Sequence, residues 1–159
     1  MTPKRVATRG ELHSILDLIV GYQKFYGVQT DREKTFVFFS QFVDSTEKGI
    51  LFAVWDHTVA WGFCTLYFNP SSLIASQCCV FNDLFVHPEH RGKGIAKALF
   101  FAASEYAIER GFTSLEWMTQ KENARAQGLY DTLPQSKTEW FNYSSKTIEL
   151  AQALKPYVK

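Results

Sequence analysis

The chain has 159 residues, a length that suits one compact domain over residues 1–159 rather than two. Its hydrophobic share of 46% excludes a disordered chain, and an aromatic share of 16% favours an additional buried surface such as a dimer interface. A net charge of +1 gives no large basic field, so neither nucleic acid nor an acidic membrane surface is an expected partner.

Targeting signals and metal-ligand patterns are both missing from the sequence. Residues 1–20 lack a signal peptide's uninterrupted hydrophobic core, and the apolar run at 95–103 is far shorter than a membrane span. Cys64, Cys78 and Cys79 suit a reducing compartment, although a catalytic cysteine stays open as an alternative. The four histidines show no metal-ligand pairing, so we expect a cytoplasmic protein without a metal ion.

The N-terminal part of the chain predicts a short strand and two helices. The strand is expected at Lys4–Thr8. Apolar residues recur every three or four positions in Glu11–Phe25, which predicts the first helix. The same spacing predicts a second helix in Asp31–Val43, with Asp31 as its N-cap.

Three strands are expected next, at Ile50–Trp55, Val59–Phe68 and Gln77–Val86. A turn at Asp56-His57 and a loop at 69–72 separate them. Short connections of this kind favour an antiparallel meander.

The second half of the chain predicts a helix at Ile95–Ile108 and then a strand at Ser114–Met118. This strand should run parallel to the one before the helix, because strand–helix–strand units of this length are almost always parallel. A short helix is expected at Asn123–Leu133 and a last strand at Lys137–Ser144. The pattern leaves open whether Ile148–Tyr157 is a terminal helix or a tail.

The most informative stretch runs from Asn82 to Ala103, where a glycine-rich basic turn lies between an apolar strand and a helix. Gly92 and Gly94 can adopt backbone conformations closed to other residues, so several N–H groups can turn toward one anion at the positive end of the helix. Basic side chains add charge around the turn, namely Arg91, Lys93 and Lys97. We therefore expect a ligand that carries a pyrophosphate.

Two common nucleotide patterns do not match this turn. The dinucleotide fingerprint requires a third glycine and an acidic ribose-binding residue, which are missing. The Walker pattern requires serine or threonine after Gly-Lys, whereas Gly92-Lys93 is followed by Gly94.

The pattern Arg-x-x-Gly-x-Ala is met by Arg91, Gly94 and Ala96, after a strand that carries Asp-Leu-Phe-Val. This stretch resembles the GCN5-related N-acetyltransferase (GNAT) superfamily, and most of all its diamine and small-amine acetyltransferases. The resemblance continues through Leu115-Glu116-Trp117, Asn123 and the Leu129-Tyr130 pair. It covers the chain from Val80 to Tyr143.

The resemblance implies an α/β (α+β) fold, with a mixed, mostly antiparallel sheet of about six to seven strands flanked by about four helices. In this fold the central strand pair splays apart, here the strands holding Asp83–Val86 and Leu115–Met118. The notch between them holds the acyl-carrying arm of acetyl-CoA, the co-substrate. In several similar enzymes the last strand crosses between subunits, so the resemblance also implies a homodimer.

The resemblance assigns main-chain groups of one strand to the pantetheine amides and the glycine-rich turn to the pyrophosphate. A main-chain N–H of Phe85 or Val86 would also support the oxyanion. The residues implied for coenzyme binding are Leu84, Phe85, Val86, Arg91, Gly92, Lys93, Gly94, Ile95, Ala96, Lys97, Asn123, Ala126 and Tyr130.

Acetyl transfer requires a neutral amine and a proton for the departing thiolate, and an amine with a pKa of ~10.4 is only about one part in 2,500 neutral at pH 7. The resemblance implies Tyr130 as the general acid. Asn82 occupies the position at which similar enzymes have a glutamate base. Asp83 or Glu116 could take the proton through water instead, although Asp83 points to the other side of a regular strand unless a bulge redirects it.

Aromatic faces and carboxylates together suit an alkylammonium group. The candidates for contact with the amine are Tyr22, Tyr26, Asn82, Trp117, Glu139 and Trp140. We therefore expect an acetyl-CoA-dependent N-acetyltransferase that acts on a small polyamine, a diamine or an amino-acid side chain. A protein lysine or N-terminal acetyltransferase and a non-catalytic acyl-CoA-binding module remain the alternatives.

Overall fold

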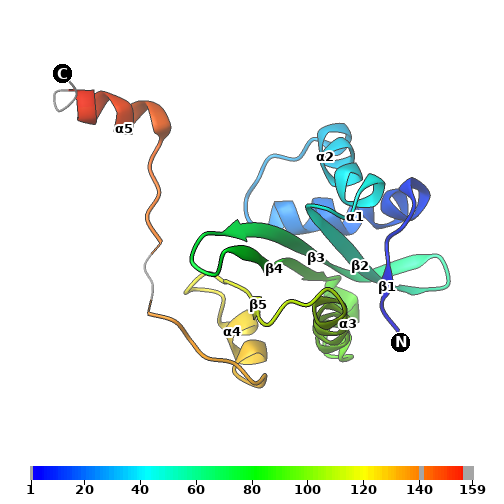
Figure 1. Cartoon of the computed structure of the whole chain (residues 1–159). Helices are drawn as coiled ribbons and strands as arrows, with labels where there is room; N and C mark the ends of the chain where they lie inside the picture. The colour runs from blue at the N-terminus through cyan, green and yellow to red at the C-terminus, as the bar shows by residue number, and fades with distance from the viewer. Residues whose placement is uncertain (1, 140–141, 156–159) are drawn as a thin grey trace. The chain divides into compact units, whose positions relative to one another are not determined.

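The computed structural model describes residues 2–139 and 142–155. Its contacts divide the chain into two compact units, Met1–Met118 and Thr119–Lys159. The first unit contains the sheet and the larger helices, and the second contains two short helices (Figure 1). Among the described residues no helix is long and apolar enough to cross a membrane.

A five-stranded sheet of order β1-β2-β3-β4-β5 forms the centre of the first unit. The strands are β1 (Lys4–Arg5), β2 (Gly49–Asp56), β3 (Val59–Ser71), β4 (Ser76–Val86) and β5 (Leu115–Glu116). The first four pair antiparallel, and β5 runs parallel to β4. The predicted meander and the predicted parallel crossover are both confirmed.

The helices of the first unit cover both faces of the sheet, with α1 and α2 on one face and α3 on the other (Figure 1). Their bounds are α1 (Arg9–Phe25), α2 (Arg32–Asp44) and α3 (Ile95–Glu109). Thr8 and Glu11 form a capping box that fixes the start of α1. Asp31 accepts a hydrogen bond from the backbone N–H of Lys34 at the start of α2, which confirms the predicted N-cap.

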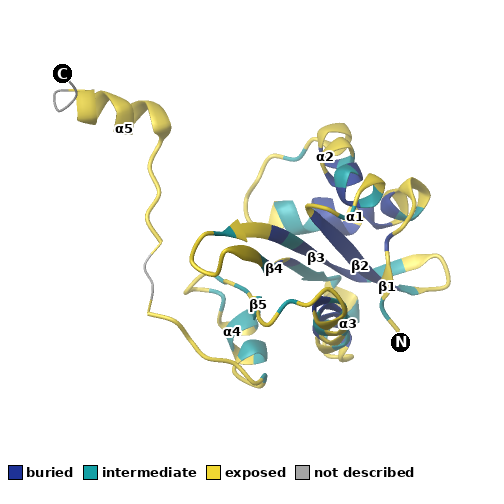
Figure 2. Ribbon diagram, in the orientation of Figure 1, coloured by how far each residue is buried: buried dark blue, intermediate teal, exposed yellow. Residues whose placement is uncertain are grey.

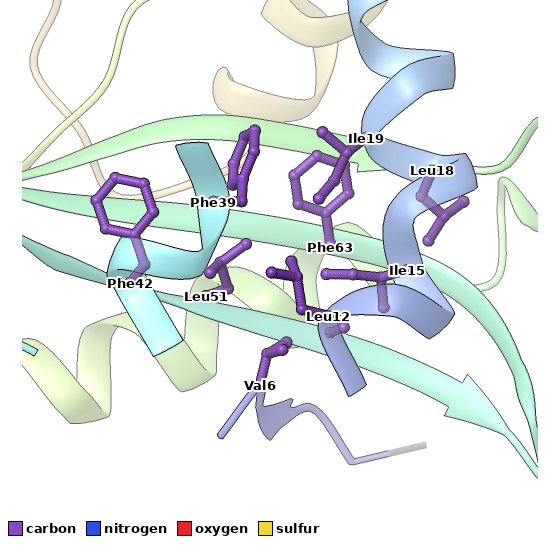
Figure 3. Close-up of a cluster of buried hydrophobic side chains, with 10 residues drawn as sticks. Val6, Leu12, Ile15, Leu18, Ile19, Phe39, Phe42, Leu51 and Phe63 are labelled. Atoms are coloured by element: carbon purple, nitrogen blue, oxygen red, sulfur yellow. The ribbon is translucent and has the colours of Figure 1, made fainter. Parts of the chain in front are cut away.

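The core lies between α1, α2 and the sheet, where the strands are buried (Figures 2 and 3). Its members come from β2, from β3, from the inner faces of both helices and from the residue after β1: Val6, Leu12, Ile15, Leu18, Ile19, Phe39, Phe42, Leu51, Ala53 and Phe63. Each fully buried Leu, Ile or Phe contributes about 1.5–3 kcal/mol. This packing holds α1 against β3 and β4, where the site lies.

The hairpin between β3 and β4 is longer than the sequence pattern predicts. Residues 69–71 continue the strand, and the turn occupies 72–75 instead of 69–72. Pro70 is tolerated because the β2–β3 pairing ends at Tyr67, which leaves one edge of β3 without a neighbouring strand. The predicted loop was therefore placed too early.

The second unit contains α4 (Ala124–Tyr130) and α5 (Thr147–Leu154). The first lies within the predicted helix at 123–133, and the second shows that residues 147–154 of the C-terminal segment form a helix. The predicted strand at 137–144 was wrong where the structure describes it, since residues 137–139 and 142–144 have no regular structure. A strand is stable only beside a partner that accepts its backbone hydrogen bonds, and this segment has none among the described residues. Within the described residues the sheet consequently has five strands rather than six to seven.

Candidate active site

The glycine loop, residues 91–94, connects β4 to α3 after a short 3-10 turn at Pro88–His90. Gly92 and Gly94 have φ values of 78° and 79°, in the left-handed region that favours glycine. A Cβ added at either glycine would meet no atom within 4 Å, so the space beside the loop is open. The loop is therefore shaped by backbone conformation rather than by packed side chains.

The backbone N–H groups of residues 92–97 donate no hydrogen bond to any described part of the chain. Those at the start of α3 have no partner within the helix, and Gly94 caps the helix without a side-chain acceptor. The unpaired N–H groups and the positive end of the helix together fit an anion. These residues therefore fit the pyrophosphate of acetyl-CoA.

Two basic side chains of the loop contact aromatic rings. Arg91 donates from Nε to the carbonyl oxygen of Val86 at 3.0 Å, and its guanidinium carbon lies 5.8 Å from the centre of the Phe85 ring. The ammonium group of Lys93 lies 5.0 Å from the centre of the Trp61 ring. Arg91 thus ties the loop to the end of β4, and Lys93 stays at its exposed rim.

A β-bulge interrupts β4 at Asn82. Thr65 lies opposite Asp83 and the next residue, Leu66, lies opposite Phe81, so Asn82 has no partner on β3. Because Asp83 pairs with Thr65, it shares the face of the sheet that α1 covers. The sequence left open whether a bulge redirects Asp83, and the structure contains one. The bulge brings the side chains of Asn82 and Asp83 together, and Nδ2 of Asn82 donates to Oδ1 of Asp83 at 3.0 Å.

Asp83 is 4% exposed, and burial raises the pKa of its carboxyl above the ordinary value. The hydroxyls of Tyr22 and Thr65 and the amide of Asn82 act in the opposite direction on this pKa. Even so, Oδ2 of Asp83 has no hydrogen-bond partner of ordinary geometry among the described residues. Burial and the charge of Asp83 also raise the pKa values of Tyr22 and Tyr67.

An aromatic wall leads from the end of α1 to this bulge. It consists of Phe25, Tyr26, Tyr22 and Phe85, in that order. Ring centres are 5.1 Å apart for Phe25–Tyr26 and for Tyr22–Tyr26, and 6.5 Å apart for Tyr22–Phe85. Tyr26 is 38% exposed, so this predicted substrate contact is accessible.

Glu116 of β5 and the next residue, Trp117, lie on different faces of the sheet. Trp117 packs edge-on against Phe100 of α3, with ring centres 5.2 Å apart, and so lies on the face opposite α1. Glu116 is exposed and pairs with Val80, two residues before Asn82, so strand alternation places it on the face of the bulge. The structure therefore does not bring Trp117 together with Tyr26.

The remaining candidates belong to the second unit. Oδ1 of Asn123 accepts from the backbone N–H of Ala126 at 3.1 Å and caps α4, which ends at the half-buried Tyr130. Glu139 is exposed, and Trp140 lies outside the described residues. The roles of these residues in binding and catalysis stay predictions.

Thr65 and Tyr67 of β3 line the Asp83 site and were missed by the sequence analysis. Thr65 is fully buried between two apolar neighbours, and Tyr67 follows two positions later on the same face. A hydroxyl in the middle of an apolar strand was the signal that could have identified them, because buried polar groups need partners. No group of three or more His, Cys, Asp and Glu side chains that could hold a metal ion occurs in residues 2–139 and 142–155.

The Acetyltransferase (GNAT) family matches residues 13–133 of this chain. The uncharacterized N-acetyltransferase YhfO of Bacillus subtilis is 32% identical over 127 residues, which cover 80% of this chain and 85% of YhfO. A thialysine N-epsilon-acetyltransferase of Caenorhabditis elegans is 32% identical over 82 residues, covering 49% of this chain and 51% of that enzyme.

Solved structures show the same fold. The crystal structure of a probable acetyltransferase has a TM-score of 0.80 and 26% identity, and covers 92% of this chain and 97% of that one. The aminoglycoside N-acetyltransferase AAC(6')-Iy in complex with CoA has a TM-score of 0.80 and 18% identity, and covers 91% and 93% of the two chains. The chain therefore belongs to the GNAT family of N-acetyltransferases and is an acyltransferase that uses acetyl-CoA.

Proposed function

We propose that the enzyme transfers the acetyl group of acetyl-CoA to the primary amine of a small molecule, namely a polyamine, a diamine or an amino-acid side chain. The observation that carries this proposal is the polar bulge at Asn82 beside the aromatic wall. Aromatic rings and oxygen acceptors together suit an alkylammonium group. The similarity to an enzyme that acetylates thialysine supports the same class of substrate.

The coenzyme would bind along β4 and the glycine loop. β5 pairs only with Cys79 and Val80, so within the described residues β5 leaves the adjoining edge of β4 unpaired from Phe81 onward. Main-chain groups of Leu84, Phe85 and Val86 would then bind the pantetheine amides as a neighbouring strand does. The N–H groups of residues 92–97 would hold the pyrophosphate.

Acetyl transfer requires a proton to leave the amine, a proton to reach the thiolate, and stabilisation of the negative charge on the oxyanion. We assign Tyr130 as the general acid for the departing thiolate. The amine proton would pass through water to Asp83 or Glu116, of which only Glu116 is exposed. A main-chain N–H of Phe85 or Val86 would stabilise the oxyanion.

Two further parts of the proposal concern organisation. Both units would belong to one N-acetyltransferase domain, because the family match at 13–133 extends over both. The protein would be a homodimer. The large exposed apolar side chains of α3, Phe101 and Ile108, lie two turns apart on one face of the helix and support an additional buried surface.

The test is a CoA-release assay with acetyl-CoA and a panel of diamines, polyamines, lysine analogues and a basic peptide. The proposal predicts turnover with small amines and little with the peptide. Preference for the peptide would instead identify a protein acetyltransferase. Coenzyme binding without CoA release for any amine would identify a non-catalytic acyl-CoA-binding module.

A further inference from the structure

The two adjacent residues Asn82 and Asp83 differ in burial. Asn82 is exposed, whereas the neighbouring Asp83 is only 4% exposed. In a regular strand such neighbours would point to opposite faces, but the bulge allows their side chains to meet. Asn82 can therefore contact a ligand, whereas Asp83 can act on that ligand only through Asn82.

The hydrogen bond between the two side chains sets the orientation of the Asn82 amide. Nδ2 of Asn82 faces Oδ1 of Asp83, as the ionised carboxylate requires because its oxygens only accept. The carbonyl oxygen of Asn82 is thereby turned away from Asp83. An amide oxygen accepts hydrogen bonds and is far too weak a base to remove a proton from an amine.

The surroundings of Asp83 explain why it would not contact the substrate itself. Tyr22 of α1 and Thr65 and Tyr67 of β3 enclose it, and Cys64 is the other titratable group influenced by its charge. No basic side chain among the described residues forms an ion pair with Asp83. Its one hydrogen bond of ordinary geometry to a described side chain is the one from Asn82.

We propose that Asp83 is a positioning residue that acts through Asn82, holding the amide so that Oδ1 of Asn82 accepts a hydrogen bond from the attacking amine. This inference rests on the proposed function. As the new C–N bond forms and the C–S bond breaks, one amine proton leaves to water and Tyr130 protonates the thiolate. A primary amine has a second N–H that stays bonded to Asn82, whereas a secondary amine has only one and loses this bond when it reacts. The pair therefore selects primary over N-methylated amines.

The first test is independent of activity. In ¹H–¹⁵N spectra of the full chain, the Asn82 side-chain amide is assigned by its loss in Asn82→Ala. Its chemical shifts are expected to change with pH as the Asp83 carboxyl titrates, and this change is expected to be absent in Asp83→Asn. Asn82 amide shifts that do not respond to pH would overturn the proposal.

The second test uses steady-state kinetics with the best amine of the panel, after the wild type has been shown to release CoA. Asp83→Ala and Asn82→Ala should each raise KM for the amine about tenfold, the effect of one hydrogen bond to a charged group, and leave KM for acetyl-CoA unchanged. The double variant should stay at about tenfold, because Asp83 acts through Asn82. Asp56→Ala, at the exposed end of β2, is the matched control and should match the wild type.

Asp83→Asn separates positioning from catalysis and is the variant of choice if Asp83→Ala does not fold. An amide oxygen at position 83 still accepts from Nδ2 of Asn82, so amine KM should stay within about threefold of the wild type. If Asp83→Asn lowered kcat strongly and also removed the acidic limb of the pH profile, Asp83 would be the base and the proposal would be overturned. Additive effects of the two substitutions in the double variant would overturn it as well. If the wild type acetylated no amine, the proposed function would be contradicted. The amine panel reveals this outcome before any variant is compared.

Discussion

The glycine loop and the β4 bulge lie on the same segment of the chain, but different kinds of interaction shape them. At the loop, two left-handed glycines and the start of α3 leave backbone N–H groups unpaired. At the bulge, one extra strand residue places a buried carboxylate behind an exposed amide. The proposed coenzyme end, which is the glycine loop, therefore depends on backbone conformation. The proposed acceptor end, which is the β4 bulge, depends on side chains packed between α1 and β3.

The largest expected effect comes from a residue outside both regions. Tyr130→Phe should lower kcat about 100-fold or more, because a general acid contributes that much, and should leave both KM values within about twofold. Steady-state kinetics with both substrates varied is the measurement. Unchanged kcat at saturating substrates would remove Tyr130 from the mechanism.

The next effect tests whether the backbone conformation of the glycine loop determines coenzyme binding. Gly94→Val places a branched residue at φ 79°, at a cost of about 1–2 kcal/mol, so the loop should shift and KM for acetyl-CoA should rise about tenfold. Gly111→Ala is the matched control, because Gly111 has φ 78° and follows the other end of α3. It should lower Tm without changing KM for acetyl-CoA, and an equal rise in both variants would contradict the account.

A smaller effect is expected from the charge around the loop. Lys93→Ala should raise KM for acetyl-CoA about threefold at low salt, because an exposed charge contributes less than about 1 kcal/mol. The difference from the wild type should shrink as salt is added. A tenfold effect that persists at high salt would show that side chains, rather than the backbone, dominate coenzyme binding.

The smallest effect concerns stability at the acceptor end. The folded-state pKa of Asp83 is raised by burial, so its contribution to stability is present at acidic pH and is lost as pH rises through that pKa. The Tm of Asp83→Asn relative to the wild type should therefore increase as pH rises from 4 to 8. Asp44→Asn should show the opposite trend in a more acidic range, below the ordinary carboxyl pKa, because the hydrogen bond from Arg9 lowers the pKa of Asp44. A flat or inverted trend for Asp83→Asn would contradict the burial argument.

The same contrast explains what the sequence could predict. Glycine and helix periodicity are local signals, so the loop, α3 and the Asp31 cap were predicted correctly. The bulge depends on how β4 pairs with β3. Its extra residue shifts the alternation by one position, so Phe81 packs on the α3 face and Phe85 on the α1 face, although their spacing in the sequence is that of a regular strand. The predicted last strand at 137–144 failed for a related reason, because pairing with a distant strand decides whether such a segment becomes one.

The most direct test measures both KM values for Gly94→Val and Asn82→Ala in one CoA-release assay. Two separate effects are expected: Gly94→Val raises KM for acetyl-CoA about tenfold and Asn82→Ala raises KM for the amine about tenfold, each leaving the other KM constant within about twofold. If either variant raised both constants equally, the coenzyme and acceptor ends would not be separate, and the account would be contradicted.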